Sequence, residues 1–456
     1  MMALPKLRMF LDRYLPPQRI FLLSFAALIG LGTILLWMPL AASDSRLRFI
    51  DALFTSASAV CITGLATIDI GRDLSLAGQI VTLVLFQIGG LGILTFSTVL
   101  FGIMGRGISF KGRELCQSTF LHTPRRDFFI IMKWILILTF SQEAAGVLLL
   151  FLRFIGETSP GNALYLAVYH ALSAFNNCGY TLFPDSLMRY RGDWLVNLTM
   201  MTLIVSGGVG FIVQYEVVNR IRGYQTRFSL HAKIVFLATA GLLTAGALLF
   251  YIFESEHLLK DLPFGARLLS SLFQSTTART AGFNTVDIGH LTNATILMFM
   301  ILMFIGASPG STGGGIKTTS FTLLLLMIWN RFRGQGSLNV FHRSVPEEIQ
   351  TRTIAIIFAA AFSVCLITSI LLITGGTNGD LPEGSRHLFV EYLFEAISAF
   401  GTVGLSMGVT PDLNDIQKLG VILLMFAGRV GPLTLAFSWY ASRRSLTYAE
   451  ESVMVG

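Results

Sequence analysis

Eight long apolar runs dominate the sequence and restrict it to one class of protein. They cover residues 20–40, 76–104, 128–154, 194–218, 232–253, 294–328, 354–373 and 419–441. A helix needs about 20 mainly apolar residues to cross the hydrocarbon core of a bilayer. Charged residues make up only 13% of the chain and hydrophobic ones 53%, which excludes a disordered chain and argues against a soluble enzyme. We therefore predict an all-α membrane protein with eight transmembrane helices, the first of which is retained rather than cleaved as a signal peptide.

The basic residues are distributed unevenly between the connections. Nineteen Lys and Arg residues lie at the two termini and in the loops that follow the even-numbered runs, against nine in the other loops. Because basic loops remain on the cytoplasmic side, both termini are predicted to be cytoplasmic. Topology thus accounts for the net charge of +7, and we expect no binding to nucleic acid.

Four short apolar segments lie between the odd and even runs and are too short to cross the membrane. They read SASAVCITGL (56–65), ALSAFNNCGY (171–180), STTARTAGF (275–283) and AISAFGTVGL (396–405). Aligning them superimposes Gly64, Gly179, Gly282 and Gly404. Self-similarity of this kind indicates repeated units. We predict four units of helix, re-entrant pore segment and helix (M1-P-M2), spanning residues 1–115, 116–225, 226–340 and 341–456.

A re-entrant segment leaves backbone groups without helical partners, which is tolerated only where protein buries them or they line water. Glycine adopts positive φ and lets the backbone approach an ion closely, and rings of carbonyl oxygens can replace the hydration shell of K+. The sequence therefore predicts that the four segments surround one pore and bind K+ at their glycines. The predicted filter consists of Ile62, Thr63, Gly64, Asn177, Cys178, Gly179, Thr280, Ala281, Gly282, Thr402, Val403 and Gly404.

A second glycine pattern occurs in the even-numbered runs. It reads Gly89-Gly90-Leu91-Gly92, Gly207-Gly208-Val209-Gly210, Gly313-Gly314-Gly315 and Gly428-Arg429-Val430-Gly431. In the sixth run, one proline and five glycines fall within residues 306–315, and such a composition does not remain a regular helix. We predict two half-helices joined by a flexible intramembrane loop over residues 306–319.

The four short segments, together with TTARTAGFNTVD and ISAFGTVGLSMG, resemble the filter sequences of the Trk/Ktr/HKT cation transporter superfamily. The similarity covers nearly the whole chain and is greatest to the KtrB-type membrane subunits of bacterial potassium uptake systems. It implies four M1-P-M2 units around one pseudo-fourfold pore in a bacterial cytoplasmic membrane. It also implies K+ preference, because all four filter positions are glycine, and leaves dependence on Na+ open.

The same resemblance implies a gate beneath the filter and two kinds of protein partner. The gate residues it implies are Gly306, Ser308, Gly310, Gly313, Gly314, Gly315, Lys317 and Arg429. The implied partners are a second copy of the chain and a cytoplasmic KtrA-like ring that binds nucleotide. The basic cytoplasmic loops suit such a ring and anionic lipid headgroups equally well.

Other readings of the sequence stay open at this point. One is a carrier for another monovalent cation, such as Na+ or ammonium. Another is a membrane-embedded hydrolase using Ser308 or Ser311, although we expect no enzyme and no organic cofactor. Residues 310–318 narrowly miss the phosphate-binding GxxxxGK[ST] pattern, with Ile316 where the lysine should be.

Several charged residues are notable for their positions. Asp69, Asp185, Asp287 and Asp412 follow the four filter glycines and are expected outside the membrane, where they could concentrate cations. Three further charged residues fall within apolar or pore segments: Lys133, Glu143 and Arg279. Lys133 is expected to extend to the cytoplasmic interface, while the sequence names no partner for Glu143 or Arg279.

Overall fold

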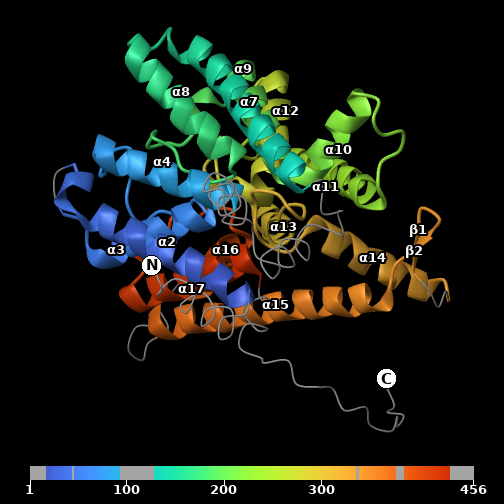
Figure 1. Cartoon of the computed structure of the whole chain (residues 1–456). Helices are drawn as coiled ribbons and strands as arrows, with labels where there is room; N and C mark the ends of the chain where they lie inside the picture. Colours follow the sequence, from blue (N-terminus) through green and yellow to red (C-terminus); the bar gives the residue numbers. More distant parts are fainter. Residues whose placement is uncertain (1–16, 44–45, 93–127, 335–337, 376–384, 432–456) are drawn as a thin grey trace, which may run out of the picture.

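The computed structural model describes residues 17–43, 46–92, 128–334, 338–375 and 385–431, and apart from one short hairpin its regular elements are helical (Figure 1). The first half contains α2 (Pro17–Trp37), η1 (Pro39–Ala41), α3 (Phe49–Cys61), α4 (Leu76–Leu91), α7 (Phe128–Phe154), α8 (Pro160–Phe175), η2 (Met188–Tyr190), α9 (Trp194–Val209) and α10 (Phe211–Ile221). The second half contains α11 (Leu230–Glu254), α12 (Phe264–Thr280), η3 (Ile288–His290), α13 (Asn293–Phe304), α14 (Thr318–Phe332), β1 (Asn339–Val340), β2 (Arg343–Ser344), α15 (Glu347–Gly375), α16 (Ser385–Gly401), η4 (Thr410–Asp412) and α17 (Asp415–Val430). Strands β1 and β2 pair antiparallel.

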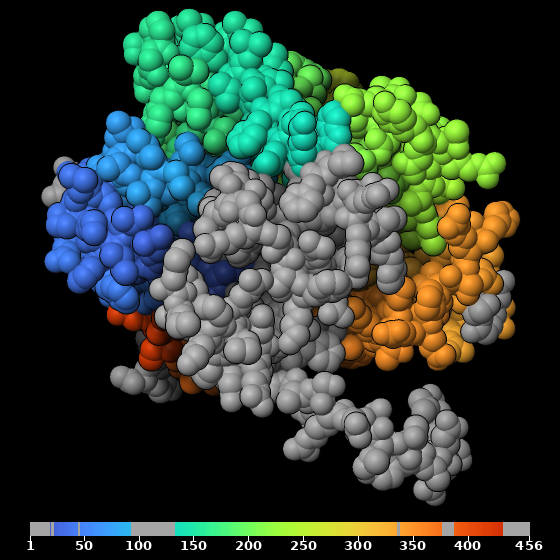
Figure 2. Space-filling model, in the orientation of Figure 1, coloured from blue at the N-terminus to red at the C-terminus, as the bar shows by residue number. Residues whose placement is uncertain are grey.

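The helices pack in four groups of three that follow one another around a closed circuit. The groups are α2–α3–α4, α7–α8–α9, α11–α12–α13 and α15–α16–α17, and within each group the three helices contact one another. The last helix of each group contacts the middle helix of the next: α4 with α8, α9 with α12, α13 with α16, and α17 with α3. We call these groups the first, second, third and fourth quarters; in Figure 2 the first (blue) and the second (teal to green) occupy separate, neighbouring parts of the visible face.

Each quarter's last helix begins at a side chain that accepts a hydrogen bond from the first turn. Ser75 accepts from the backbone N–H of Gly78, Asp193 from Val196, Thr292 from Thr295 and Asn414 from Gln417. Such caps satisfy amide groups that have no partner inside the helix. These four helices therefore start at sites fixed by local sequence.

Three of these last helices end at the final glycine of the predicted glycine pattern. Gly92, Gly210 and Gly431 have φ of 79°, 101° and 93°, values that L side chains rarely adopt. Each helix therefore has only 16 residues, or about 24 Å at 1.5 Å per residue. The fourth predicted span, 194–218, is bent, because α9 and α10 meet at Gly210 at an angle of 101°.

Within the described residues, three helices are long and apolar enough to cross a membrane alone. They are Lys133–Phe154, Leu230–Glu254 and Glu347–Gly375, and the bent pair α9–α10 would make a fourth. The predicted second and eighth spans, 76–104 and 419–441, run beyond the described residues after 92 and 431. The count of eight spans therefore stays a prediction.

The sixth run is interrupted, as its composition predicted. Helix α13 ends at Phe304, α14 begins at Thr318, and residues 305–317 between them form an irregular segment. We call it the intramembrane loop, after the location predicted for it. Ile305 and Ile316, at its two ends, form a parallel β-bridge. The helical break is thus slightly displaced from the predicted 306–319.

The third quarter's glycine pattern, predicted at Gly313-Gly314-Gly315, lies in the intramembrane loop rather than in a helix. Gly89, Gly207 and Gly428 each lie 13 residues after the first residue of their helix. The same count from the start of α13 reaches Gly306, two residues past the end of that helix. In this quarter the equivalent position therefore lies outside the helix.

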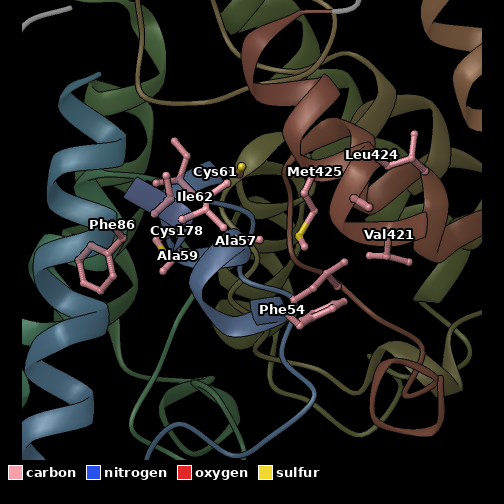
Figure 3. Close-up of a cluster of buried hydrophobic side chains, with 14 of the residues drawn as sticks. Phe54, Ala57, Ala59, Cys61, Ile62, Phe86, Cys178, Val421, Leu424 and Met425 are labelled. Atoms are coloured by element: carbon pink, nitrogen blue, oxygen red, sulfur yellow. The ribbon is translucent and has the colours of Figure 1, made fainter. Parts of the chain in front are cut away.

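Buried apolar side chains join the first and fourth quarters. The largest cluster combines Phe54 and Ala57 of α3 with Phe86 of α4 and with Val421 and Met425 of α17. Figure 3 shows α3 lying between α4 and α17, with Cys61, Ile62 and Cys178 at the end where the short helices meet. The core therefore holds the C-terminal end of α3 in a fixed place.

Candidate functional site

The four predicted filter glycines lie together and form a closed ring. A Cβ atom added to any of these glycines would overlap a carbonyl oxygen of another quarter. In each case the oxygen belongs to the residue that precedes the glycine of that other quarter. At Gly179, for example, it would lie 2.6 Å from the oxygen of Ala281. The four overlaps, in order, run from Gly64 to Cys178, from Gly179 to Ala281, from Gly282 to Val403, and from Gly404 to Thr63. All four glycines have φ between 80° and 93°, so both conformation and space require glycine there.

Three of the four turns that lead into this ring share one conformation. Ile62, Asn177 and Thr402 have φ of 53°, 56° and 50°. After them, the N–H groups of Thr63, Cys178 and Val403 donate to the carbonyls of Ser58, Ser173 and Ser398 at 2.8–2.9 Å. These are helix C-terminal turns closed by a left-handed residue.

The third quarter departs from this conformation. Helix α12 continues to Thr280, the residue equivalent to Ile62, Asn177 and Thr402. The N–H of Ala281 donates to Thr277 at 3.0 Å, which continues the α-helical pattern. The third pore segment therefore reaches its glycine by a different backbone path.

Hydroxyl groups on the four short helices brace the ring. Ser58 and Ser398 accept from the N–H groups of Gly64 and Gly404 at 3.0 and 3.1 Å. Ser173 donates to the carbonyl of Tyr180 at 2.7 Å, and Thr277 to that of Phe283 at 2.6 Å. These bonds fix the backbone on both sides of the glycines without using the carbonyl oxygens of the glycines themselves.

The intramembrane loop is hydrogen-bonded to the second quarter. The N–H groups of Ser308 and Thr312 donate to the carbonyls of Gly208 and Gly207 at 3.1 and 3.2 Å. The Asn177 carboxamide donates to Thr312 Oγ1 at 2.7 Å. Because Asn177 belongs to the predicted filter, this bond joins the loop directly to the ring.

The loop is also anchored to the fourth quarter. The N–H of Gly314 donates to Thr402 Oγ1 at 2.9 Å, and that of Gly315 to the carbonyl of Gly428 at 3.2 Å. Within the loop, Lys317 Nζ donates to the carbonyl of Gly313 at 2.7 Å. The predicted gate residues Gly306, Ser308, Gly310, Gly313, Gly314, Gly315 and Lys317 thus all lie in one segment beside the ring.

Arg429 connects this segment to the first quarter. Its Nη1 donates to the carbonyl of Thr312, and its Nη2 donates to the carbonyl of Gly89 and, at 3.3 Å, to that of Gly90. Carbonyls at the end of α4 carry partial negative charge, which suits a guanidinium. The second and fourth quarters therefore bond to the loop directly, and the first quarter is linked to it through Arg429 of the fourth.

The two serines considered as nucleophiles are engaged in the structure of the loop. Ser308 Oγ lies 3.0 Å from Thr318 Oγ1, and Ser311 Oγ donates to the carbonyl of Ser308 at 2.6 Å. Neither hydroxyl contacts a histidine among the described residues, and His290 pairs with Asp287 at 2.9 Å. Their geometry indicates a role in shaping the loop.

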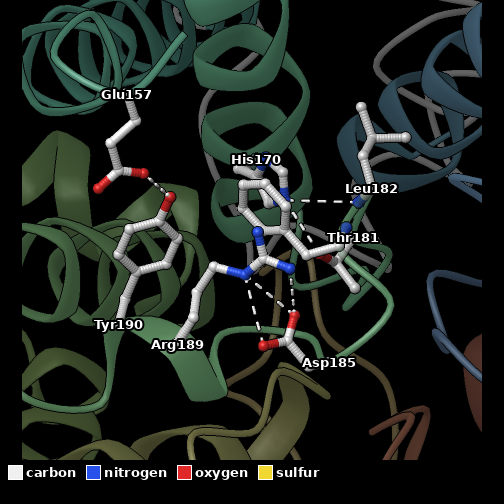
Figure 4. A network of polar contacts seen from close by, with 8 residues as sticks. Glu157, His170, Thr181, Leu182, Asp185, Arg189 and Tyr190 are labelled. Atoms are coloured by element: carbon white, nitrogen blue, oxygen red, sulfur yellow. Dashed lines mark hydrogen bonds and ion pairs between the residues drawn. The ribbon is translucent and has the colours of Figure 1, made fainter.

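The four acids that follow the glycines have different surroundings. Asp185 forms an ion pair with Arg189 at 2.7 Å (Figure 4), and this guanidinium lowers the pKa of the carboxyl. Asp69 accepts from the N–H groups of Gly71 and Arg72, and Asp412 is exposed in η4. Among the described residues no contact joins these acids to one another. Their common role in attracting cations stays a prediction.

The three other predicted charges also differ in environment. Lys133 is exposed in the first turns of α7. Glu143 is buried and accepts hydrogen bonds from Gln87 and Asn176. Arg279 is 6% exposed in α12, and its Nε has no hydrogen-bond partner in the described structure.

Sequence reasoning missed two features of the site. Thr312 contacts both the ring and Arg429 but was not selected, because a threonine among glycines carries no distinctive signal. Lys418 and Asp51 form a buried ion pair of 2.8 Å between α17 and α3. Their charges were visible in the sequence, but a separation of 367 residues hid the pairing.

Comparisons with known proteins agree on one family. A sequence profile described as TrkH, cation transport protein, matches residues 19–444. The Ktr system potassium uptake protein B of Bacillus subtilis is 37% identical, over 97% of each chain. The potassium/sodium uptake protein NtpJ of Enterococcus hirae is 35% identical, over 97% of this chain and 98% of that one. The crystal structure of the potassium transporter TrkH from Vibrio parahaemolyticus aligns with a TM-score of 0.70 at 18% identity, covering 92% of this chain and 83% of that one.

Proposed function

Because this chain belongs to the TrkH family of cation transport proteins, we propose that it takes up K+ through the ring of four glycines. It is a multi-pass membrane protein of a transporter family and not an enzyme. The observation that carries the proposal is the closed ring of Gly64, Gly179, Gly282 and Gly404, one from each quarter. The names of full-length relatives, which describe potassium uptake, support the choice of ion.

The ring suits a dehydrated monovalent cation for physical reasons. Four short helices end beside it, and the negative ends of their dipoles favour a cation. Backbone oxygens from four sides can replace water around K+ without introducing a full negative charge that would hold the ion too tightly. In this proposal the filter consists of the twelve residues predicted from sequence, with K+ bound at the four glycines.

Uptake of Rb+ or K+ by cells that lack their own K+ uptake systems tests the transport function. We expect expression of the chain to restore uptake and growth at low K+. Absence of uptake despite confirmed membrane expression would contradict it.

Gly64→Ser tests the filter assignment. Its Cβ would overlap the oxygen of Cys178, so we expect weaker discrimination of K+ against Na+. Gly241→Ser is the matched control, because a Cβ there meets nothing within 4 Å. Unchanged ion competition in Gly64→Ser would remove Gly64 from the filter.

We propose that the intramembrane loop is the gate and that Arg429 holds it in place. The bonds from Arg429 to Thr312 and to the end of α4 support this role, because moving the loop would break them. We expect Arg429→Gln to raise the rate of Rb+ uptake per transporter. A rate equal to that of wild type would argue that Arg429 does not hold the gate.

Transport of Na+ is the second candidate function. It is favoured by NtpJ, a full-length relative that is named for both potassium and sodium. Uptake of 22Na+ in the absence of K+ would support it, and Rb+ uptake measured with and without Na+ would distinguish transport of Na+ from dependence on it.

The proposal includes both termini in the cytoplasm, a homodimer, and a KtrA-like nucleotide-binding ring as the regulatory partner. Similarity to Ktr system proteins supports the partner, and the distribution of basic residues supports the orientation. Reporter fusions at each end test the orientation, and crosslinking followed by co-purification with the ring tests the assembly.

A further inference from the structure

A buried carboxyl group in α7 lies behind the proposed filter and has no role so far. Glu143 is 3% exposed and lies within the membrane-crossing part of α7, Lys133–Phe154. No Lys, Arg or His forms an ion pair with it among the residues described. Acidic residues at such depth are costly and by default mark a functional site, so the contacts of Glu143 need an explanation.

Two carboxamides provide the hydrogen bonds of Glu143. Gln87 Nε2 of α4 donates to Glu143 Oε1 at 2.8 Å, and Asn176 Nδ2 donates to the same oxygen at 3.4 Å. Asn176 Nδ2 also donates to Gln87 Oε1 at 2.6 Å. The three side chains therefore form a closed triangle that joins α4, α7 and the end of α8.

Asn176 places this triangle directly beside the proposed filter. It is the residue after α8 and the one before Asn177, whose side chain donates to Thr312 of the intramembrane loop. The turn into the second filter segment is thus restrained at two consecutive residues, at Asn176 by Glu143 and at Asn177 by Thr312 of the loop. At the equivalent position the other quarters have Cys61, Arg279 and Gly401, so this support is particular to the second quarter.

The same asparagine lies against Gly90, the residue whose carbonyl group Arg429 contacts. A Cβ added to Gly90 would overlap the Asn176 carboxamide, and the carbonyl of Gly90 accepts from Arg429 Nη2 at 3.3 Å. A shift of the Asn176 side chain would therefore disturb both the filter turn and the hydrogen bond from Arg429 to Gly90.

We propose that Glu143 is a positioning residue that fixes the second filter turn through Asn176 and Gln87. This inference rests on the proposed transport function and adds a residue that contacts neither the ring nor the ion. Two donors from different helices converge on one buried oxygen of Glu143, and such a connected set of hydrogen bonds restrains all of its members, which suits a group that holds a turn in place.

The experiment measures initial rates of Rb+ uptake, and their inhibition by Na+, for wild type, Glu143→Leu, Glu143→Gln and the control Gln142→Leu. Gln142 is the neighbour of Glu143, but its side chain bonds to Gln214 of α10 at 2.9 Å, away from α8. For Glu143→Leu we expect KM for Rb+ to rise about tenfold, as expected for loss of one buried hydrogen bond, together with weaker discrimination against Na+. Glu143→Gln keeps an acceptor oxygen and should give intermediate values, whereas Gln142→Leu should keep the wild-type KM.

A merely structural role would lower the amount of transporter, and hence the maximal rate, without changing KM or ion discrimination. That result for Glu143→Leu would overturn the inference. If Glu143→Leu does not reach the membrane, Asn176→Ala removes the same link from the other side, and an unchanged KM there would overturn it equally. Absence of uptake by the wild type would instead contradict the proposed function and this inference with it.

Discussion

The second and third quarters both interrupt their last helix, but by different means. In the second quarter a single residue, Gly210, turns the chain by 101° between α9 and α10. In the third quarter the whole segment 305–317 separates α13 from α14. The two interruptions are bonded together, because the N–H of Phe211 donates to the carbonyl of Gly310 at 2.9 Å.

This difference shows two ways of satisfying the backbone at membrane depth. A single glycine changes direction while most amide groups remain inside helices. A long irregular segment leaves many amide and carbonyl groups to be satisfied by neighbours, and here the second and fourth quarters provide partners. Bonds to neighbours can be exchanged in a conformational change, whereas the bend at Gly210 is set by its own φ. The comparison therefore supports the proposal that the gate lies in the third quarter.

The strongest test of the comparison is Gly306→Val against Gly208→Ala. A Cβ at Gly306 would overlap the carbonyl oxygen of Gly314 within the loop, whereas at Gly208 the nearest atom is 4.0 Å away. We expect Gly306→Val to lose at least about 3 kcal/mol of stability or to prevent folding, and Gly208→Ala to be close to wild type. Yield of monodisperse protein and thermal unfolding in detergent measure both. Equal stability of the two variants would contradict the packing described for the loop.

Gly210→Ala tests whether the bend in the second quarter depends on glycine. Its φ of 101° and ψ of 135° fall where a side chain is strained, and the added Cβ would lie 2.7 Å from the oxygen of Pro309. We expect a loss of about 2 kcal/mol, seen as a lower unfolding temperature. Gly241→Ala, inside α11, should lose nothing. A Gly210→Ala protein with wild-type stability would show that the bend is imposed from outside.

Thr312→Val and Thr402→Val separate the two anchors of the loop. The first removes the acceptor for Asn177 Nδ2 and the second the acceptor for the N–H of Gly314. Each should cost about 1 kcal/mol and should raise the rate of Rb+ uptake per transporter, because the loop is held less firmly. If one variant has the larger effect on the uptake rate, its bond is the stronger of the two anchors. If both variants keep the wild-type stability and rate, neither bond anchors the loop.

The smallest effect is expected for Asp185→Asn, outside the membrane in the second quarter. Arg189 lowers the pKa of Asp185, so the ion pair stabilises the folded state above the unfolded carboxyl pKa of about 3.9 and loses this effect as pH falls through the lower, folded value. Both side chains are more than a third exposed, so the loss should be at most a few tenths of a kcal/mol. Unfolding temperatures of the two proteins should differ slightly at pH 7 and converge in acid. A difference that grows in acid would contradict the assignment.

Much of the local structure could be predicted from the sequence. Composition and the length of the apolar runs indicated membrane helices, and the Gly-Pro-rich segment predicted the break in the sixth run, because glycine and proline disfavour helix whatever surrounds them. The alignment on Gly64, Gly179, Gly282 and Gly404 identified the residues that the fold brings together. Their positive φ follows from a local property of glycine.

Other features could not be predicted, because they depend on contacts between distant segments. The bend at Gly210 was missed, since apolar residues continue directly after it from Phe211 to Val213. The register of Gly306 was missed because only the start of α13 defines it. Nothing near Glu143 in sequence identifies Gln87 or Asn176 as its donors.

The sequence by itself thus determined where helices can form, where glycine allows the backbone to leave the helical conformation, and which family the chain resembles. These properties depend on residue type and spacing along one segment. Only the tertiary structure decided which carbonyl oxygen each glycine faces, which quarters hold the intramembrane loop, and what Arg429 and Glu143 contact. Such pairings depend on how the four groups of helices close into one circuit, because that closure places the donors and acceptors around each buried polar group.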